Sequence, residues 1–320
     1  MSSSMVQLPS GPMPLVGMGL WKLSPVSAPL TIYQAIQAGY RLFDGAADYG
    51  NEREAGEGIK RAIADGLVTR DELFIVSKLW NTFHGEDKVE EACRRSLSDW
   101  GLDYFDAYLI HFPIALKYVD PKVRYPPGWS FADDGNIAVE RSPLHLTWKA
   151  MEQLVDLKLV KTIGISNFSG SLIMDLMTYS HIKPSILQVE MHPYHVQKDL
   201  IELCKAFGIH LMAFCSFGPQ SWIELNDPKV KLVGSLLSLD TIVNIANAHS
   251  KSPAQVLLMW ATQRNVTVIP KSSNEERSKE NLNSLDFILS ADEIERISSL
   301  DKGFRFNQPA GIDARISIFA

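Results

Sequence analysis

The sequence predicts an α/β fold, a (β/α)8 TIM barrel with long loops and a C-terminal tail over one end of the barrel. Three observations carry this prediction. Short apolar runs recur along the chain, and segments with helical spacing of apolar residues lie between them. Strands that alternate with helices are expected to be parallel, and eight such units close naturally into a barrel. The chain has 320 residues, which suffices for such a barrel, so we expect residues 1–320 to form a single barrel domain.

The predicted strands share one pattern, a nearly continuous apolar run bounded by turn or charged residues. Continuous apolar runs are typical of strands that are covered on both faces. In strands with one face exposed to solvent, apolar and polar residues alternate. The predicted strands are Leu15–Leu20, Arg41–Gly45, Leu73–Lys78, Asp106–Phe112, Thr162–Asn167, Ile186–Glu190, His210–Ser216 and Thr267–Ser272.

The segments between the strands carry apolar residues at the spacing of one helix face. In Glu52–Asp65, for example, Ala55, Ile59 and Ala62 form a single stripe. The other predicted helices are Pro29–Ala38, Val89–Trp100, His145–Leu157, Ser169–Tyr179, Lys198–Phe207, Leu239–His249 and Pro253–Arg264.

The main alternative fold is an open, doubly wound sheet. That fold usually shows the pattern G-x-G-x-x-G after its first strand, because a dinucleotide binds there. In this chain Gly17 and Gly19 are followed by Leu20-Trp21-Lys22, so the third glycine is missing. The barrel is therefore favoured.

Three stretches are too long to be simple connections between a strand and a helix. They are Pro113–Pro143, Phe217–Ser238 and the tail Asp301–Ala320. Loops of this length in a compact domain usually form lids or binding sites. We expect the tail to cover the end of the barrel where the active site of such a fold lies.

Composition and charge exclude several classes of protein. The net charge is −6 and no basic block occurs, so nucleic-acid binding is not expected. The three cysteines form no C-x-x-C pair, and His192 and His195 flank a proline, so neither a disulfide framework nor a metal site is expected. No signal peptide or long apolar run occurs. We expect a cytoplasmic protein without membrane partners, as a monomer or homodimer.

Polar residues end otherwise apolar strands along the whole chain. In a (β/α)8 barrel the side chains at the carboxyl ends of the strands face the active site. A polar strand end is common in any protein, so each residue alone has an ordinary explanation, but eight together indicate a site. They are Asp44, Lys78, His111, Asn167, Gln188, Glu190, Ser216 and Lys271.

Asp44, Tyr49, Lys78 and His111 form the first candidate cluster. A phenol is a poor acid at neutral pH, but a neighbouring ammonium lowers its pKa. We expect Lys78 to lower the pKa of Tyr49 and Asp44 to keep Lys78 charged, while His111 hydrogen-bonds a substrate oxygen. Together these groups donate a proton and polarise a carbonyl. The alternative is that Lys78 and Asp44 merely form an ion pair at the mouth of the barrel.

The second candidate cluster lies in the segment Ile269–Asn281. Ser272, Ser273 and Asn274 can cap a helix that starts near Glu275, and free N–H groups at a helix start bind phosphate. Cationic side chains in this cluster would strengthen phosphate binding. The alternative is an exposed capped helix with scattered charges, which Glu275 and Glu276 favour in part. The two cations are Lys271 and Arg277.

The third candidate cluster is the segment Ala213–Ser221, directly after a predicted strand. Glycine and small polar residues there allow a diphosphate to approach the backbone closely. Phe214 could stack on a flat ring, or it could simply pack inside the barrel.

With these residues the chain resembles the aldo-keto reductases over residues 5 to 309. Three segments in the right order carry the resemblance, Gly39–Glu52, Leu159–Phe168 and the Ile269-Pro270-Lys271-Ser272 segment. More narrowly it resembles the fungal aldopentose reductases, the D-xylose and L-arabinose reductases. That likeness rests on short motifs, namely Gly19–Lys22, Lys78–Asn81, Ile110–Pro113, Arg124–Gly128, Ser216–Ser221 and Arg305–Asn307.

The resemblance implies a role for each of the candidate residues. It implies a catalytic tetrad of Asp44, Tyr49, Lys78 and His111, with Tyr49 as the general acid, and a nicotinamide held by Ser166, Asn167 and Gln188 beside Phe214. It implies a loop over the diphosphate that includes Ser216, Phe217, Gly218, Gln220 and Ser221. The adenosine and its 2′-phosphate would meet Lys271, Ser272, Ser273, Asn274, Arg277 and Asn281, with Glu224 near the adenosine ribose. NADPH is therefore the expected cofactor, and NADH use is also expected to be possible.

Some positions depart from the pattern of these relatives. Phe214 stands where a tyrosine usually stacks on the nicotinamide, and Ser273 stands where asparagine is common. Met191 precedes His192, where related reductases tend to carry two histidines. The tail 310–320 also differs from the expected one.

We expect the substrate to be an open-chain aldopentose, L-arabinose or D-xylose, which is reduced to the pentitol. A sugar site needs an apolar wall and a few fixed polar groups. Asp48 and Asn307 are the expected polar groups. Phe304 is expected near the far end of the sugar, where it would favour L-arabinose; the alternative is that it only packs the tail against the barrel. The wall is expected to contain Trp21, Trp80, Phe112 and Trp222 beside His111. The alternatives are a broad-specificity aldehyde or keto reductase and a regulatory subunit that senses the cofactor with the same barrel.

Overall fold

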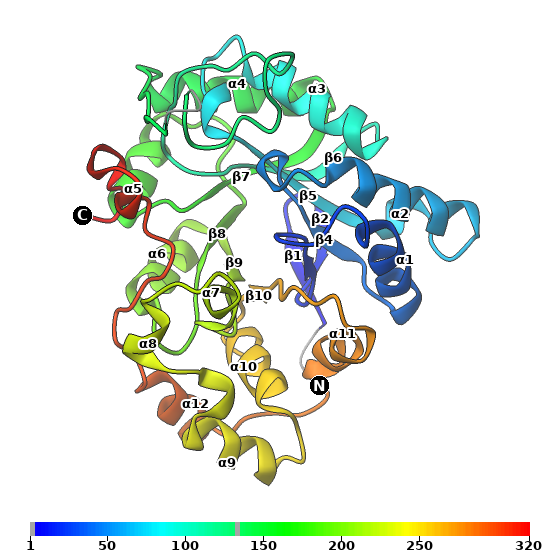
Figure 1. Cartoon of the computed structure of the whole chain (residues 1–320), viewed down its shortest axis with the longest axis vertical. Helices are drawn as coiled ribbons and strands as arrows, with labels where there is room; N and C mark the ends of the chain where they lie inside the picture. Colours follow the sequence, from blue (N-terminus) through cyan, green and yellow to red (C-terminus); the bar gives the residue numbers. More distant parts are fainter. Residues whose placement is uncertain (1–3, 132–134) are drawn as a thin grey trace.

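A sheet of eight parallel strands forms the centre of the computed structural model, which describes residues 4–131 and 135–320 (Figure 1). The strands follow one another around the sheet in the order of the sequence, as a barrel requires. They are β3 (Met18–Gly19), β4 (Leu42–Asp44), β5 (Phe74–Leu79), β6 (Phe105–Ile110), β7 (Val160–Ser166), β8 (Ile186–Glu190), β9 (His210–Phe214) and β10 (Thr267–Val268).

Backbone contacts between the first and last strands close this sheet into a barrel. Val16 forms a parallel bridge with Val268. The amide of Gly17 donates to the carbonyl oxygen of Val268 over 2.8 Å, and the amide of Val268 donates to Leu15 over 2.9 Å. The (β/α)8 prediction is therefore confirmed, and the open doubly wound sheet is excluded.

Helices surround the barrel, as the spacing of apolar residues predicts (Figure 1). Their apolar stripes pack on the outer face of the sheet and bury large side chains such as Trp148 and Trp260. The longer helices are α1 (Ala28–Ala38), α2 (Glu52–Ala64), α3 (Val89–Trp100), α4 (Leu144–Asp156), α5 (Gly170–Tyr179), α6 (Lys198–Phe207), α9 (Asp240–Ala248), α10 (Pro253–Thr262), α11 (Glu275–Leu282) and α12 (Ala291–Ser298).

A hairpin that the sequence analysis did not predict closes the amino-terminal end of the barrel. It consists of β1 (Met5–Leu8) and β2 (Gly11–Pro14), which pair antiparallel. Leu8 and Met13 point from the hairpin into the barrel and are buried. They join the interior cluster of the strands, which contains Leu42, Phe74, Val76, Ala107, Leu109, Ile186, Met212 and Ile269.

The three long connections come together at the opposite end, where the strands have their carboxyl ends. Residues 132–134 of the predicted loop Pro113–Pro143 lie outside the described residues. The connection after β9 contains short helices α7 (Gln220–Ile223) and α8 (Val230–Val233), and the tail contains two 3-10 turns, Pro309–Gly311 and Ala314–Ile316. Arg315 of the tail donates to the carbonyl oxygen of Ile137 over 2.8 Å, so the tail and the first loop are in contact.

In the described part of the chain, none of the helices combines the length and the apolarity that crossing a membrane requires.

Candidate active site

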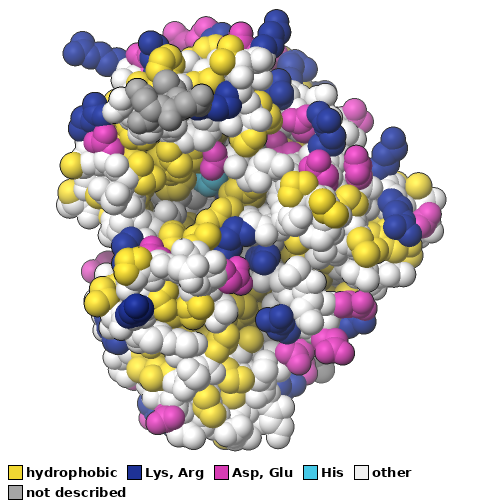
Figure 2. Space-filling model, in the orientation of Figure 1, with side chains coloured by type: hydrophobic (Ala, Val, Ile, Leu, Met, Phe, Trp, Pro, Cys, Tyr) yellow, Lys and Arg dark blue, Asp and Glu magenta, His cyan; other side chains and the backbone are white. Residues whose placement is uncertain are grey.

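A cavity opens at the carboxyl ends of the strands and encloses about 1130 Å³, its open mouth included. Figure 2 shows the molecule hollowed near the middle of this face, with many apolar side chains on the rim. The cavity is lined mainly by residues at strand ends and in the three long connections. Most of the residues expected to bind cofactor or substrate lie along it, namely Trp21, Asp48, Trp80, Phe112, Ser166, Asn167, Gln188, Phe214, Ser216, Phe217, Gln220, Ser221, Trp222, Glu224, Lys271 and Asn307.

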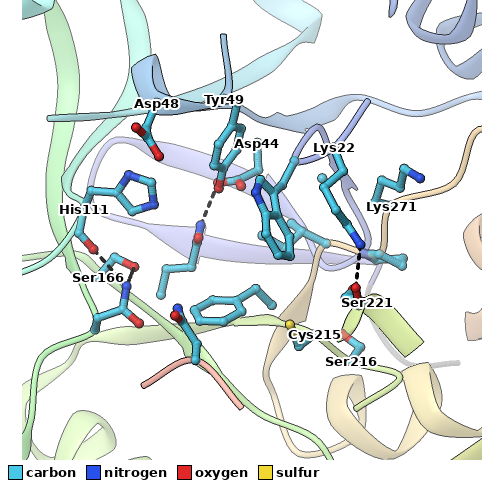
Figure 3. A pocket seen from close by; sticks show the side chains of 18 of the residues that line it. Lys22, Asp44, Asp48, Tyr49, His111, Ser166, Cys215, Ser216, Ser221 and Lys271 are labelled. Atoms are coloured by element: carbon cyan, nitrogen blue, oxygen red, sulfur yellow. Dashed lines mark hydrogen bonds between the residues drawn. The ribbon is translucent and has the colours of Figure 1, made fainter. Parts of the chain in front are cut away.

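The four predicted catalytic residues meet at the base of this cavity. Lys78, in β5, is fully buried and donates to both carboxylate oxygens of Asp44 over 2.9 and 2.8 Å. The same ammonium donates to the carbonyl oxygen of Gly45 over 2.8 Å and lies 3.2 Å from the hydroxyl oxygen of Tyr49. Both predicted contacts of Lys78, with Asp44 and with Tyr49, are present. The ring of His111 lies beside that of Tyr49, 5.8 Å between centroids (Figure 3).

The pKa of Tyr49 is raised and not lowered, in contrast to the expectation. Burial raises the pKa of Tyr49 well above its usual value, and the carboxylates of Asp44 and Asp48 raise it further. Asp44 binds the ammonium of Lys78 through both of its oxygens, so Lys78 is already paired. Tyr49 is therefore a neutral phenol that holds its proton, and the nearby ammonium is placed to stabilise the phenolate once that proton has left.

His111 is also neutral in this site. Burial lowers the pKa of its imidazole well below the usual value, and the charge of Lys78 lowers it further. The ring packs edge-on against Trp80, 5.2 Å between centroids, so its orientation is fixed. A neutral imidazole carries one N–H that can donate to an oxygen in the cavity.

Asp48 lies close to Tyr49 and His111 at the same end of the cavity (Figure 3). Burial raises the pKa of its carboxyl group to about 7. The group thus changes between an acceptor and a donor of hydrogen bonds near neutral pH.

Of the residues expected around a nicotinamide, Asn167 and Phe214 line the cavity, and Gln188 in addition binds Asp44. Asn167 has a positive φ of 62° and donates to the carbonyl oxygen of His111 over 2.9 Å and to Ser166 Oγ over 3.1 Å. Its buried Oδ1 has no partner and lies in the cavity wall. Gln188 instead donates to Asp44 Oδ1 over 2.6 Å, so it also supports the tetrad. The ring of Phe214 lines the cavity, as expected.

The loop after β9 forms one side of the cavity. Ser216 lines it, and its buried hydroxyl oxygen has no partner. Gly218 does not line the cavity. Its φ of 60° is a conformation that other residues rarely adopt, and an added Cβ would lie 2.7 Å from a methyl group of Leu236. The loop needs glycine there in order to turn over the cavity.

Lys22 bridges the two sides of this part of the cavity, although the sequence analysis gave it no role. Its Nζ donates to the carbonyl oxygen of Ser221 over 2.7 Å and to Glu224 over 2.8 Å (Figure 3). Burial alone would raise the pKa of Glu224, but Lys22, Lys271 and Arg277 together hold it below its usual value. The loop is therefore tied across the cavity by an ion pair.

The predicted phosphate cluster lies next to this bridge. α11 starts at Glu275, as expected, and Asn274 caps it by accepting from the amide of Arg277 over 2.9 Å. Ser272 Oγ accepts from the amide of Asn274 over 3.1 Å. Of this cluster Lys271 alone lines the cavity, among the described residues. The others lie beyond its edge, namely Ser272, Ser273, Asn274, Arg277 and Asn281.

At the end of the cavity where the sugar was expected, Trp129 is an additional wall residue and Phe304 is absent from the wall. Trp129 lines the cavity and packs edge-on against Trp80, 5.0 Å between ring centroids. The indole N–H of Trp80 donates to the carbonyl oxygen of Gly128 over 3.0 Å and so fixes this loop. Phe304 is not part of the cavity wall but packs against Phe306, 5.0 Å between ring centroids. Phe304 therefore packs within the tail and does not line the cavity as expected.

Cys215 lines the cavity but has no features of a nucleophile. Burial raises the pKa of its thiol far above the usual value. In the described residues no group of three or more His, Cys, Asp or Glu is arranged to hold a metal ion.

Comparisons with known proteins agree with this arrangement. The sequence model described as the aldo/keto reductase family matches residues 15–302. A protein of Aspergillus terreus named probable NAD(P)H-dependent D-xylose reductase is 53% identical over 320 residues, which cover all of both chains. One of Aspergillus clavatus with the same name is 54% identical over 99% of this chain and 96% of its own. One of Aspergillus niger, named NAD(P)H-dependent D-xylose reductase, is 53% identical over the whole of both chains. With its barrel, its Asp–Tyr–Lys–His cluster and these matches, the chain belongs to the aldo/keto reductase family.

Proposed function

We propose that this protein reduces the aldehyde of open-chain aldopentoses, D-xylose or L-arabinose, to the corresponding pentitol with NADPH or NADH. The observation that carries the proposal is the position of the Tyr49 hydroxyl. It lies 3.2 Å from a buried ammonium at the base of a cavity that Asp48 and Asn307 also line. A proton donor in a cavity that also contains polar side chains suits the reduction of a polyhydroxylated aldehyde.

The cavity has the features that a nicotinamide dinucleotide requires. Phe214 offers a flat apolar surface, and the unpaired Asn167 Oδ1 is available to a carboxamide N–H. The unpaired Ser216 Oγ lies in the loop expected at the diphosphate, and Lys271 lies beyond it. When bound, the cofactor would supply a hydride to the carbonyl carbon.

Tyr49 donates the proton to the carbonyl oxygen in the proposed reaction. Because burial and Asp44 hold its pKa high, the phenol keeps its proton until negative charge develops on the substrate oxygen. The phenolate that results lies next to the Lys78 ammonium, which stabilises it. Lys78 acts after the transfer rather than before it.

His111 orients the carbonyl group for this transfer. It is neutral, so it can donate one N–H to the carbonyl oxygen without competing with Tyr49 as an acid. Asn167 holds the backbone of His111 by its hydrogen bond to the carbonyl oxygen. Tyr49 follows β4 and His111 follows β6, so the two donors reach the carbonyl oxygen from either side of β5.

We infer that NADPH is preferred over NADH, because cations gather where the 2′-phosphate is expected. Lys271 and Arg277 are both close enough to Glu224 to lower its pKa. Glu224 is itself held by Lys22, which leaves the two other cations for an anionic ligand. NADH use remains compatible with this arrangement, because Glu224 can accept hydrogen bonds from a ribose.

An assay of cofactor oxidation with several substrates tests the proposal. We expect D-xylose and L-arabinose to be reduced, with the pentitol identified as the product. The aromatic wall of Trp80, Phe112 and Trp129 would also suit a broad-specificity aldehyde reductase. Aromatic aldehydes and keto-steroids reduced far better than either pentose would establish that second function. A protein that binds the cofactor but reduces none of these substrates would instead be the cofactor-sensing regulatory subunit.

A further inference from the structure

A buried carboxylate at the end of β8 has no role in the site described so far. Glu190 is the last residue of this strand and has no exposed surface. Its Oε1 lies 2.8 Å from His192 Nε2 and accepts from the amide of Phe306 over 2.8 Å. Its Oε2 accepts from the amide of Asn307 over 2.8 Å. Burial alone would raise the pKa of Glu190, but these hydrogen bonds hold it below its usual value, so the group is a carboxylate.

The two amides belong to the part of the tail that reaches the cavity. Asn307 lines the cavity, and its main chain is held by one oxygen of Glu190. Phe306 next to it is completely buried and is held by the other oxygen. A single carboxylate on a rigid strand thus fixes two consecutive residues of a segment that has no helix or strand of its own at this point.

The loop after β9 fixes Phe306 from the opposite side. The ring of Trp222, which lines the cavity, stacks on that of Phe306 with 6.0 Å between centroids and 14° between planes. Lys229 donates to the carbonyl oxygen of Phe306 over 3.0 Å. The position of Asn307 therefore depends on contacts at Phe306 and on the direct bond to Glu190.

We propose that Glu190 is a positioning residue for substrate recognition, because its carboxylate holds the side chain of Asn307 against a hydroxyl group of the sugar. This inference rests on the proposed function, since it assumes a polyhydroxylated substrate. Glutamate is needed because each of its oxygens accepts one amide of the tail. Glutamine would turn an NH2 group toward one of those amides, and two donors cannot pair.

Glu152 offers a matched control elsewhere in the molecule. It is buried on α4, and its Oε1 accepts from the consecutive amides of His181 and Ile182 over 2.7 and 2.8 Å. Glutamine keeps one oxygen that can still accept both amides, so Glu152→Gln removes a buried carboxylate without removing its two contacts. Glu152 does not line the cavity. An effect of removing a buried carboxylate as such should therefore appear in both variants, whereas an effect of losing a contact with the tail should appear only in Glu190→Gln.

The experiment compares Glu190→Gln, Glu152→Gln, Asn307→Ala and the double variant Glu190→Gln with Asn307→Ala. The measurement is kcat/KM for D-xylose and for butanal, which has no hydroxyl group. We expect Glu190→Gln to lower the ratio of kcat/KM for D-xylose to kcat/KM for butanal on the order of tenfold, which corresponds to about 1.4 kcal/mol. Most of this loss should appear as a higher KM for the sugar. Glu152→Gln should leave the ratio unchanged. The double variant should lose no more selectivity than Asn307→Ala alone, because both changes remove the same contact.

The proposal would be overturned if the effects of Glu190→Gln and Asn307→Ala on the ratio of kcat/KM values multiplied in the double variant. It would also be overturned if Glu190→Gln lowered the melting temperature and left that ratio unchanged. Glu190→Asp, which retracts the carboxylate, answers the same question if Glu190→Gln does not fold. Hydrogen exchange of the amides of Phe306 and Asn307 provides a readout without substrate. If the wild type reduces no pentose, the proposed function fails. Unchanged exchange of the two amides in Glu190→Gln would show separately that Glu190 does not hold the tail.

Discussion

Asp48 and Tyr49 are neighbours in the sequence, and burial raises the pKa of both. The sequence analysis chose both residues correctly for the cavity but assigned the wrong direction to the pKa of Tyr49. That error has a physical reason, because the sequence shows that an ammonium is near but not how deeply the site is buried. Desolvation disfavours the phenolate more strongly than an already paired Lys78 favours it.

The raised pKa of Asp48 predicts a pH-dependent cost to stability. The carboxyl group has a pKa of about 7 in the folded protein, above the value near 4 of an unfolded chain. Its contribution to stability is therefore fully present below about pH 4 and is lost as the pH rises through about 7. The melting temperature of Asp48→Asn should therefore exceed that of the wild type by an amount that grows as the pH rises from 5 to about 8. Thermal melts without ligand across this range measure the effect.

An exposed carboxylate provides the control for this measurement. Asp103 lies on the surface, so Asp103→Asn should show no such trend. A constant difference in melting temperature between Asp48→Asn and the wild type at every pH would mean that Asp48 is not desolvated in the folded protein.

Among the elements, α3, α6 and β8 have the bounds that the sequence predicted, and the start of α11 was also predicted correctly. Asn274 was expected to cap a helix starting near Glu275, and it does. α12 was missed, although Ser290 and Glu293 carry the capping-box pattern that could have revealed it. The cavity contacts of Lys22 and Trp129 could not have been predicted, because their partners are distant in the sequence. Lys22 meets Glu224, and Trp129 is placed through the bond between Trp80 and Gly128.

The start of α11 should distinguish the two cofactors. Arg277→Ala is expected to weaken NADPH binding about tenfold more than NADH binding, because only the former loses a charge-assisted hydrogen bond. Dissociation constants from quenching of tryptophan fluorescence measure this difference. Lys279→Ala is the matched control, since Lys279 lies on the same helix but pairs with Glu275 over 2.6 Å. Equal losses for the two cofactors would mean that Arg277 has a structural role.

In the molecule as a whole, the two ends of the barrel have different tasks. Strand and helix periodicity predicted the barrel, and the polar strand ends predicted which end holds the site. The hairpin at the other end was not predicted, because Gly11, Pro12 and Pro14 read as a loop. Only the folded barrel shows that Leu8 and Met13 fill its interior.

We therefore predict that a substitution that creates a cavity in the closed, amino-terminal end of the barrel lowers stability and leaves catalysis unchanged. Met13 is completely buried, so Met13→Ala should lower the free energy of unfolding by about 2–5 kcal/mol. Its kcat/KM should stay close to that of the wild type. Val26→Ala is the control, because Val26 is 94% exposed and its loss should change little. Denaturant titration together with initial rates tests this, and a parallel loss of activity would contradict it.

The proposal depends most on Tyr49 as the proton donor, and Tyr49→Phe tests it most directly. The variant removes one hydroxyl group from the base of the cavity, 3.2 Å from Lys78 Nζ. We expect the dissociation constant for NADPH to change little, while kcat for D-xylose or L-arabinose falls by about 10²–10⁴-fold. A variant that kept about a third of the wild-type kcat, with the chemical step limiting the rate, would contradict the account.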